Sequence, residues 1–197
     1  MTEAREWWAN RKLMRYYQEA QPWTPDLVAA ILEGHPKRVV ELGCNVGRNL
    51  RAIANEDPGV QLVGVDVNAE AVAWGRRKWG LDLRLGDDSL LEPDAYDVAF
   101  TVSVLDHMPD PARALTALAA AAPRLLLLEP WIGVEGPAKS RNPYTWSWDY
   151  ATRLRGMGWR VTSRKFPIGP DYLGPDYRLY RATRPVEVVD DTGGETT

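Results

Sequence analysis

Short apolar runs alternate with helix-like stretches along most of the 197-residue chain. The apolar runs are bounded by glycine, proline or acidic residues, which is typical of β-strands. We expect seven strands, at residues 38–42, 61–66, 82–85, 96–102, 124–128, 159–166 and 177–182. The stretches between and before them predict helices at residues 5–17, 24–34, 47–55, 69–78, 110–123 and 144–155.

This alternation predicts an α/β protein, with a doubly wound, mostly parallel seven-stranded sheet and helices on both faces. The run at residues 124–128 supports a parallel sheet, because its leucines are continuous rather than alternating with polar residues. We divide the chain into an N-terminal helical lid at residues 1–35, a ligand-binding domain at residues 36–183 and a disordered tail at residues 184–197. The tail is polar, with an acidic and Gly/Thr-rich end.

The most informative segment is RVVELGCNVGRNL at residues 38–50. An apolar run ends in Glu41, a tight turn of small residues follows at 43–47, and a helix-like stretch begins. A second acid, Asp66, ends the next apolar run. An acid about 20 residues beyond a glycine turn is where a ribose-binding carboxylate lies in a doubly wound sheet. The spacing therefore predicts a cofactor that contains a nucleoside.

Two such cofactors suit this scaffold, a dinucleotide and S-adenosylmethionine. A dinucleotide needs G-x-G-x-x-G beside its pyrophosphate, whereas Asn45 and Arg48 replace two of those glycines here. Glu41 would also repel a phosphate. S-adenosylmethionine has no phosphate and carries a sulfonium and an ammonium group, so an acid beside it is favourable. The electrostatics favour S-adenosylmethionine, and asparagine adopts the left-handed conformation that the turn requires better than most residues do.

The motifs resemble those of the class I (Rossmann-like) S-adenosylmethionine-dependent methyltransferases over residues 36–183. ELGCNVG is similar to the family's acid-x-G-x-G-x-G loop, and VLDHMPDP resembles the VLEH-x-PDP segment of members that act on small molecules. The resemblance implies that the residues of the first loop wrap the methionine part of the cofactor: Glu41, Gly43, Cys44, Asn45 and Gly47. It also implies that Ser103, in the loop after the fourth strand, lies beside the methionine part. It further implies that Asp66 holds the ribose, Val67 packs on the adenine, Asp87 accepts from the adenine amine, and Asp88 or Ser89 flanks it.

The residues after the fourth strand include a candidate base. His107 should face the transferred methyl, and near neutral pH it is able to take a proton from a substrate hydroxyl or amine. Asp106 is the alternative base, acting directly or by orienting the imidazole. A purely structural histidine also remains open, since many methyl transfers need only positioning.

Aromatic residues gather in two segments, one before the first strand and one after the fifth. The chain has nine Trp and eight Tyr, whose rings are suited to lining a pocket as well as a core. With Glu129, at the end of the fifth strand, the expected substrate-binding residues are Trp8, Tyr16, Tyr17, Trp23, Tyr144, Trp146 and Trp148. Helix packing is the competing explanation for some of them.

Composition narrows the function further. A net charge of −3 argues against a general nucleic-acid binder, and no apolar run is long enough to span a membrane. One cysteine and no signal peptide favour a cytoplasmic protein, and no metal site is predicted. We expect a monomeric or homodimeric methyltransferase that acts on an O, N or S atom of a small molecule. The alternatives are non-methylating chemistry with the same cofactor and a non-catalytic cofactor-binding regulatory protein.

Overall fold

The computed structural model describes residues 2–12, 18–138, 143–166 and 177–185. Its helices are α1 (Glu3–Ala9), α2 (Thr24–Leu32), α3 (Arg48–Glu56), α4 (Ala69–Trp79), α5 (Ala112–Ala121) and α6 (Tyr150–Gly156), with 3₁₀ turns η2 (Asp88–Leu90) and η3 (Leu105–His107). Its strands are β1 (Arg38–Leu42), β2 (Gln61–Asp66), β3 (Asp82–Leu85), β4 (Val98–Val102), β5 (Arg124–Pro130), β6 (Gly136–Pro137), β7 (Trp146–Ser147), β8 (Arg160–Lys165) and β9 (Tyr177–Thr183).

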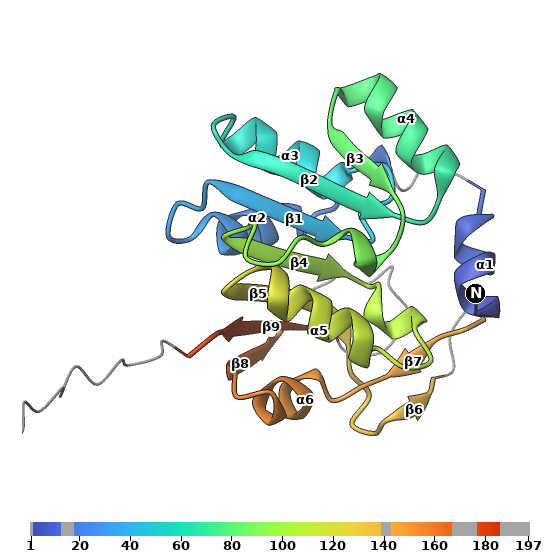
Figure 1. Cartoon of the computed structure of the whole chain (residues 1–197), viewed down its shortest axis with the longest axis vertical. Coiled ribbons are helices and arrows are strands. Elements are labelled where there is room, and N and C mark those ends of the chain that lie inside the picture. Colours follow the sequence, from blue (N-terminus) through green and yellow to red (C-terminus); the bar gives the residue numbers. More distant parts are fainter. Residues whose placement is uncertain (1, 13–17, 139–142, 167–176, 186–197) are drawn as a thin grey trace, which may run out of the picture.

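Seven of these strands form one sheet in the order β3-β2-β1-β4-β5-β9-β8. The neighbours from β3 to β5 pair in parallel, while β9 runs antiparallel to both β5 and β8. The predicted mostly parallel seven-stranded sheet is therefore confirmed. The parallel strands point toward one edge, where α1 stands (Figure 1). That edge is where a doubly wound sheet binds its ligands.

Helices cover both faces of the sheet, as the sequence predicts. Consecutive residues of β1 point to opposite faces, so Val40 packs in a core cluster with α5 and α6, and Val39 in a second cluster with α2 and α3. Figure 1 shows α5 in front of β4 and β5. Two separate cores of buried aliphatic and aromatic residues hold the strand ends rigidly, which fixes the position of the loops that follow them.

Two predicted helices are shorter in the structure. The helix expected at residues 144–155 starts at Tyr150, because Asp149 accepts a hydrogen bond from Thr152 N and caps it. The residues before it form β7, which pairs with β6 in a small hairpin that the sequence does not predict. The helix expected at residues 5–17 ends at Ala9, where Asn10 caps the last turn; residues 13–17 lie outside the described residues.

The predicted lid boundary at residue 35 is wrong. Leu27 and Ile31, one turn apart on α2, are fully buried, and Trp23 is 4% exposed in the same core cluster. The helix packs against α3 and belongs to the sheet domain, so the predicted lid is confined to the residues before Trp23. At the other end, Arg184 pairs with Asp94 and donates to Ala119 O, so the first residue of the predicted tail is anchored. Residues 186–197 lie outside the described residues.

The described residues contain no helix that combines the length and the apolar composition that crossing a membrane requires.

Deleting residues 1–22 should leave a folded sheet domain, because neither core cluster contains a described residue of this segment. Circular dichroism and urea unfolding should show a single cooperative transition with nearly unchanged steepness. A deletion of residues 1–33 serves as the comparison, since it removes the fully buried Leu27 and Ile31. The longer deletion should lose the transition; loss in the shorter one would mean that α1 is part of the core.

Candidate active site

The turn after β1 is built from residues in left-handed conformations. Gly43, Asn45 and Gly47 have φ angles of 74°, 50° and 82°. The first of these conformations directs the backbone N–H groups of Gly43 and Cys44 onto Val65 O of β2, at 2.7 and 3.1 Å. Asn45 thus takes the left-handed conformation expected of it. The result is a compact turn that lies across the ends of β1 and β2.

Neighbouring side chains leave this turn no room for larger residues. A Cβ on Gly43 would lie 2.3 Å from a methyl group of Val104, in the loop after β4. Cys44 is buried, and its Sγ would lie 2.6 Å from a Cβ on Gly64. Burial raises the pKa of the Cys44 thiol, so this thiol stays protonated and acts as a packing group.

Glu41 brings a buried carboxyl group to the turn. Its side chain is 1% exposed, and Oε1 accepts a 2.6 Å hydrogen bond from Asn49 Nδ2 of α3. Among the described residues, Oε2 is buried without a hydrogen-bond partner. Burial raises the pKa of Glu41 to about 8, and the Asn49 hydrogen bond and the charge of Arg48 offset part of the rise. The site therefore holds an oxygen that would favour a cationic ligand.

Asp66 links the first two loops. Its Oδ2 accepts from Asn45 N at 2.7 Å, and its Oδ1 accepts from Asn68 N at 2.8 Å. Burial raises the pKa of the Asp66 carboxyl group, although these backbone bonds favour its charged form. A carboxylate oxygen is able to accept more than one hydrogen bond, so both oxygens of Asp66 retain capacity for ribose hydroxyls. Val67, the predicted adenine contact, follows Asp66 and is partly exposed.

The loop after β3 is held by ion pairs on two sides. Asp87 Oδ1 accepts from Ser89 N and Oγ, and Asp87 Oδ2 lies 2.8 Å from Arg5 Nη1 of α1. The Ser89 hydrogen bonds, with Arg5, lower the pKa of Asp87 to about 2. Asp88 is 4% exposed and pairs with Arg113 of α5 at 2.6 Å. Asp88 thus braces the loop against α5.

Glu129 lies near the end of the fifth strand, as predicted, but its carboxylate is bonded within the protein. It is fully buried at the end of β5, and its carboxylate accepts from the Thr101 hydroxyl at 2.7 Å and from the backbone N–H groups of residues 104–106 at 3.1–3.3 Å. These bonds occupy both carboxylate oxygens, which disfavours the predicted contact with a substrate. Glu129 instead shapes the loop after β4, whose first residue, Ser103, has a φ angle of 52°.

His107 and Asp106 lie together in that loop. The Nδ1 atom of His107 is 3.1 Å from Tyr144 O, and because a carbonyl only accepts, Nδ1 carries the proton. The other nitrogen, Nε2, is 3.6 Å from Asp106 Oδ1. Burial lowers the pKa of His107 to about 4, so the ring is neutral near pH 7. Burial raises the pKa of Asp106, which also accepts from Ser103 Oγ.

Helix α1 lies over these loops and is tied to them. The ring centroids of Trp8 and His107 are 4.1 Å apart. Asn68 Nδ2 donates to the carbonyl oxygens of Trp8 and Arg11, at 3.2 and 2.8 Å. With the ion pair between Arg5 and Asp87, the helix is joined to the loops that follow β2, β3 and β4. The predicted position of Trp8 beside the site is consistent with this geometry.

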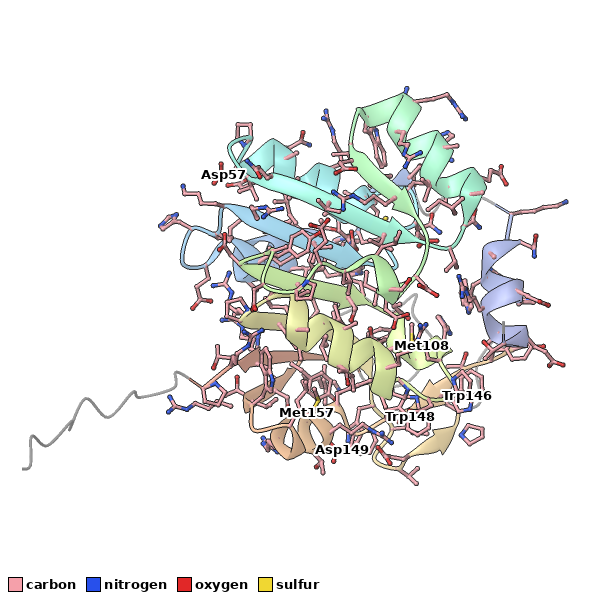
Figure 2. The ribbon with its side chains drawn as sticks, viewed as in Figure 1. Asp57, Met108, Trp146, Trp148, Asp149 and Met157 are labelled. Carbon is pink, nitrogen blue, oxygen red and sulfur yellow. The ribbon has the colours of Figure 1, made fainter. Side chains whose placement is uncertain are left out.

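The other predicted substrate residues divide into two groups. Trp23 belongs to the core cluster of α2 and α3, whereas Trp148 packs against the cluster of α5 and α6. The Nε1 atom of Trp148 donates to Met108 O at 3.0 Å, and Figure 2 labels both residues. Tyr144 and Trp146 stack, with ring centroids 6.4 Å apart. Tyr144 also reaches Glu3 of α1, so these two rings lie near the lid. Tyr16 and Tyr17 lie outside the described residues.

Comparison with known proteins agrees with this arrangement. A family model described as a methyltransferase domain matches residues 40–123, which include the β1 turn, the acids after β2 and β3, and the loop after β4. Over these residues the chain is similar to the methyltransferase domain, and its fold is that of the class I S-adenosylmethionine-dependent methyltransferases. The ubiquinone biosynthesis O-methyltransferase of Sodalis glossinidius (strain morsitans) is 28% identical over 152 residues, which cover 73% of this chain and 58% of that protein.

Solved structures share the family's fold. A Burkholderia thailandensis 1,6-didemethyltoxoflavin-N1-methyltransferase gives a TM-score of 0.66 at 20% identity, over 83% of this chain and 79% of that chain. The [4+2]-cyclase SpnF gives 0.65 at 19% identity, over 82% and 81%. The chain spans about half the length of the curated relatives it matches, with coverage from 44% to 58% of the first four.

The sequence does not indicate the role of several residues that build the candidate active site. Asn49 supports Glu41 from the next helix, and nothing in the spacing marks it. Asn68 is recognisable as a helix cap, since it accepts from Ala71 N, but its second role, holding the lid, depends on tertiary contacts. Arg5 and Tyr177 reach the site from elements far away in sequence; Tyr177 OH lies 2.9 Å from Ser103 Oγ.

Substituting Gly75 by alanine should destabilise the cofactor turn. A Cβ at this position of α4 would lie 2.2 Å from Val46 O, so the helix must move away from the turn. We expect a loss of about 1–3 kcal/mol in unfolding free energy, measured by urea denaturation. Gly156→Ala is the matched control, since Gly156 ends α6 with nothing within 4 Å of its Cβ position. Equal stability of both variants would contradict the close contact.

Proposed function

We propose that this protein transfers a methyl group from S-adenosylmethionine to an oxygen, nitrogen or sulfur atom of a small molecule. The observation that carries the proposal is the carboxyl group of Glu41, buried beside the β1 turn with one oxygen lacking a partner among the described residues. In its charged form this group would repel a phosphate, whereas a sulfonium or an ammonium would stabilise that form.

The other residues around the edge suit the same cofactor. Asp66 has both the position and the spare acceptor capacity for ribose hydroxyls. Asp87 is charged at neutral pH and would accept from the adenine amine, sharing its oxygens with Arg5. Gly43, Cys44, Asn45 and Gly47 would lie along the methionine part, with Ser103 opposite. The donor set therefore fits S-adenosylmethionine.

When bound, the cofactor supplies a methyl group on a positively charged sulfur, which is a strong electrophile. The protein's own contribution is to position the acceptor and to exclude water. Helix α1 supports the second role, because Trp8 covers His107 and Asn68 holds the lid's backbone. His107 is neutral near pH 7, so its free Nε2 is able to accept the acceptor's proton while Tyr144 O orients the ring through Nδ1. Asp106, 3.6 Å from Nε2, would stabilise the ring once it is protonated.

Small acceptors are favoured by the names of similar proteins, which include a ubiquinone biosynthesis O-methyltransferase and a trans-aconitate 2-methyltransferase. The net charge of −3 gives no support for a nucleic-acid substrate. A cytoplasmic location and a monomeric or homodimeric state stay predictions, the first resting on the single cysteine.

Non-methylating chemistry is the second candidate, because one protein with a similar fold, SpnF, is named as a [4+2]-cyclase. The two functions differ in the fate of the cofactor. Methyl transfer consumes S-adenosylmethionine and forms S-adenosylhomocysteine in step with a heavier acceptor. Tight cofactor binding with no loss of its methyl group, across a broad acceptor screen, would favour the cyclase-like or regulatory alternative.

Calorimetry should show micromolar-range binding of S-adenosylmethionine or S-adenosylhomocysteine and much weaker binding of NAD. In Asp66→Ala the affinity should fall about 10–100-fold, because a charged acceptor for two hydroxyls is lost. Glu70→Ala, an exposed acid in the following helix, should bind normally. Preferential binding of NAD would overturn the cofactor assignment.

The affinity for S-adenosylmethionine should rise with pH between about 6 and 7.5. Glu41 is protonated in the free protein below its pKa of about 8, and a cationic ligand favours the carboxylate, so binding releases a proton. The limit is about tenfold per pH unit for one proton. Glu41→Gln has no proton to release and should give a flatter profile. A wild-type affinity that is independent of pH would show that Glu41 keeps its proton.

His107→Ala should slow the single-turnover rate by about 10²–10⁴-fold if His107 is the base, with cofactor affinity nearly unchanged. An unperturbed histidine would give a rising rate near pH 6.5. Since burial lowers the pKa of His107 to about 4, the rise should lie near pH 4 instead.

Asp106→Asn and the double variant test whether Asp106 acts through His107. Equal losses without additivity would mean that the two act as a unit. Wild-type rates in His107→Ala would show that the ring is structural.

A further inference from the structure

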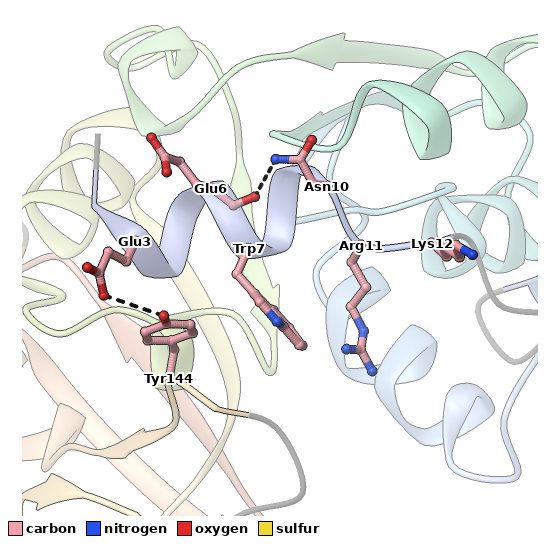
Figure 3. Close-up of a pocket in the computed structure, with 7 residues that line it drawn as sticks. All are labelled: Glu3, Glu6, Trp7, Asn10, Arg11, Lys12 and Tyr144. Atoms are coloured by element: carbon pink, nitrogen blue, oxygen red, sulfur yellow. Dashed lines mark hydrogen bonds between the residues drawn. The ribbon is translucent and has the colours of Figure 1, made fainter.

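A cavity of about 650 Å³ lies beside the lid, between α1 and the segment that carries Tyr144 (Figure 3). Trp7 and Tyr144 form its aromatic walls, and their ring centroids are 6.4 Å apart. Arg11 and Lys12 supply two positive charges, and Glu3 and Glu6 supply two negative ones. Figure 3 shows Trp7 and Arg11, one turn apart, pointing to the same side of the chain.

Arg11 holds its charge in place without an acidic partner. Its guanidinium carbon lies 4.4 Å from the ring centroid of Trp7 and 5.4 Å from that of Trp8. Among the described residues no carboxylate pairs with it, and its Nε is buried without a hydrogen-bond partner. By contrast, six other arginines each pair with an acid: Arg5, Arg84, Arg113, Arg153, Arg181 and Arg184. A fixed and unpaired guanidinium is suited to binding an anion.

The cavity adjoins the candidate active site. Tyr144, one of its walls, accepts a hydrogen bond from His107 through its carbonyl oxygen. The ring of Trp8 contacts both the guanidinium group of Arg11 and the imidazole ring of His107. The charge of Arg11 also contributes to the lowered pKa of His107, which places the two groups within electrostatic reach. A molecule anchored in the cavity therefore lies beside Tyr144, which bonds directly to the proposed base.

We propose that this cavity binds the carboxylate of a hydroxy- or amino-substituted aromatic acid, the methyl acceptor, and that Arg11 determines this specificity. The proposal rests on the proposed methyltransferase function. The guanidinium's planar fork matches a carboxylate, and the walls of Trp7 and Tyr144 suit a flat ring. Glu3 and Glu6 balance Arg11 and Lys12, which favours a singly charged acid over a phosphate and offers acceptors to its hydroxyl or amine.

A matched pair of probes tests the charge. With S-adenosylhomocysteine present, calorimetry should show that 3,4-dihydroxybenzoate binds at least about tenfold more tightly than 3,4-dihydroxybenzamide. In Arg11→Gln this preference should disappear, and in Arg11→Lys it should be partly retained. Arg77→Gln, which removes an exposed charge from α4, should keep the full preference. S-adenosylhomocysteine should bind equally to all four proteins, which also shows that each is folded.

Equal affinity for the two probes, or a preference that survives in Arg11→Gln, would overturn the inference while cofactor binding stands. Tighter binding of phenyl phosphate than of the benzoate would overturn the choice of a carboxylate. Failure of the wild type to bind S-adenosylhomocysteine would instead remove the proposed function on which the inference rests.

Discussion

The candidate site depends on one buried carboxyl group, that of Glu129. No cation lies among the described groups that bond to it; a hydroxyl and three successive backbone N–H groups of the β4 loop do so instead. Burying such a group is unfavourable unless its oxygens are satisfied, and here the loop satisfies them. The loop in turn receives a fixed shape, including the left-handed Ser103. The placement of Val104 on the β1 turn and of His107 under the lid follows from that shape.

The remaining acids of the edge serve as structural links as well as candidate ligand contacts. Asp66 joins the loops after β1 and β2, and Asp87 joins the loop after β3 to the lid. Because each carboxylate accepts several hydrogen bonds, one side chain is able to do both. This double use keeps the loops together with few residues.

Much of the fold follows from the sequence, because periodicity and turn residues act locally. Strands β1, β2 and β3 begin and end at the predicted residues, and glycine or asparagine stands where the turn needs a positive φ. What failed depends on contacts between distant segments. Trp23 looks like the other aromatic residues of the predicted lid. It directly precedes α2, however, and is buried in the core with Leu27 and Ile31 of that helix. Glu129 and Glu41 both stand near the end of a strand. The β4 loop donates hydrogen bonds to the carboxylate of Glu129, whereas Oε2 of Glu41 has no partner among the described residues, and the sequence does not reveal this difference.

The ion pair between Arg5 and Asp87 has a consequence for how firmly α1 is attached to the sheet domain. Arg5 is 39% exposed in its side chain, so dissolved ions reach the pair and screen it. The sheet beneath is held by buried aliphatic contacts, which moderate salt does not weaken. Ionic strength therefore acts on the two layers unequally: it weakens the tie between α1 and the β3 loop and leaves the floor of the site intact. The attachment of α1 is thus sensitive to the salt of the surroundings in a way that the sheet's resistance to unfolding is not.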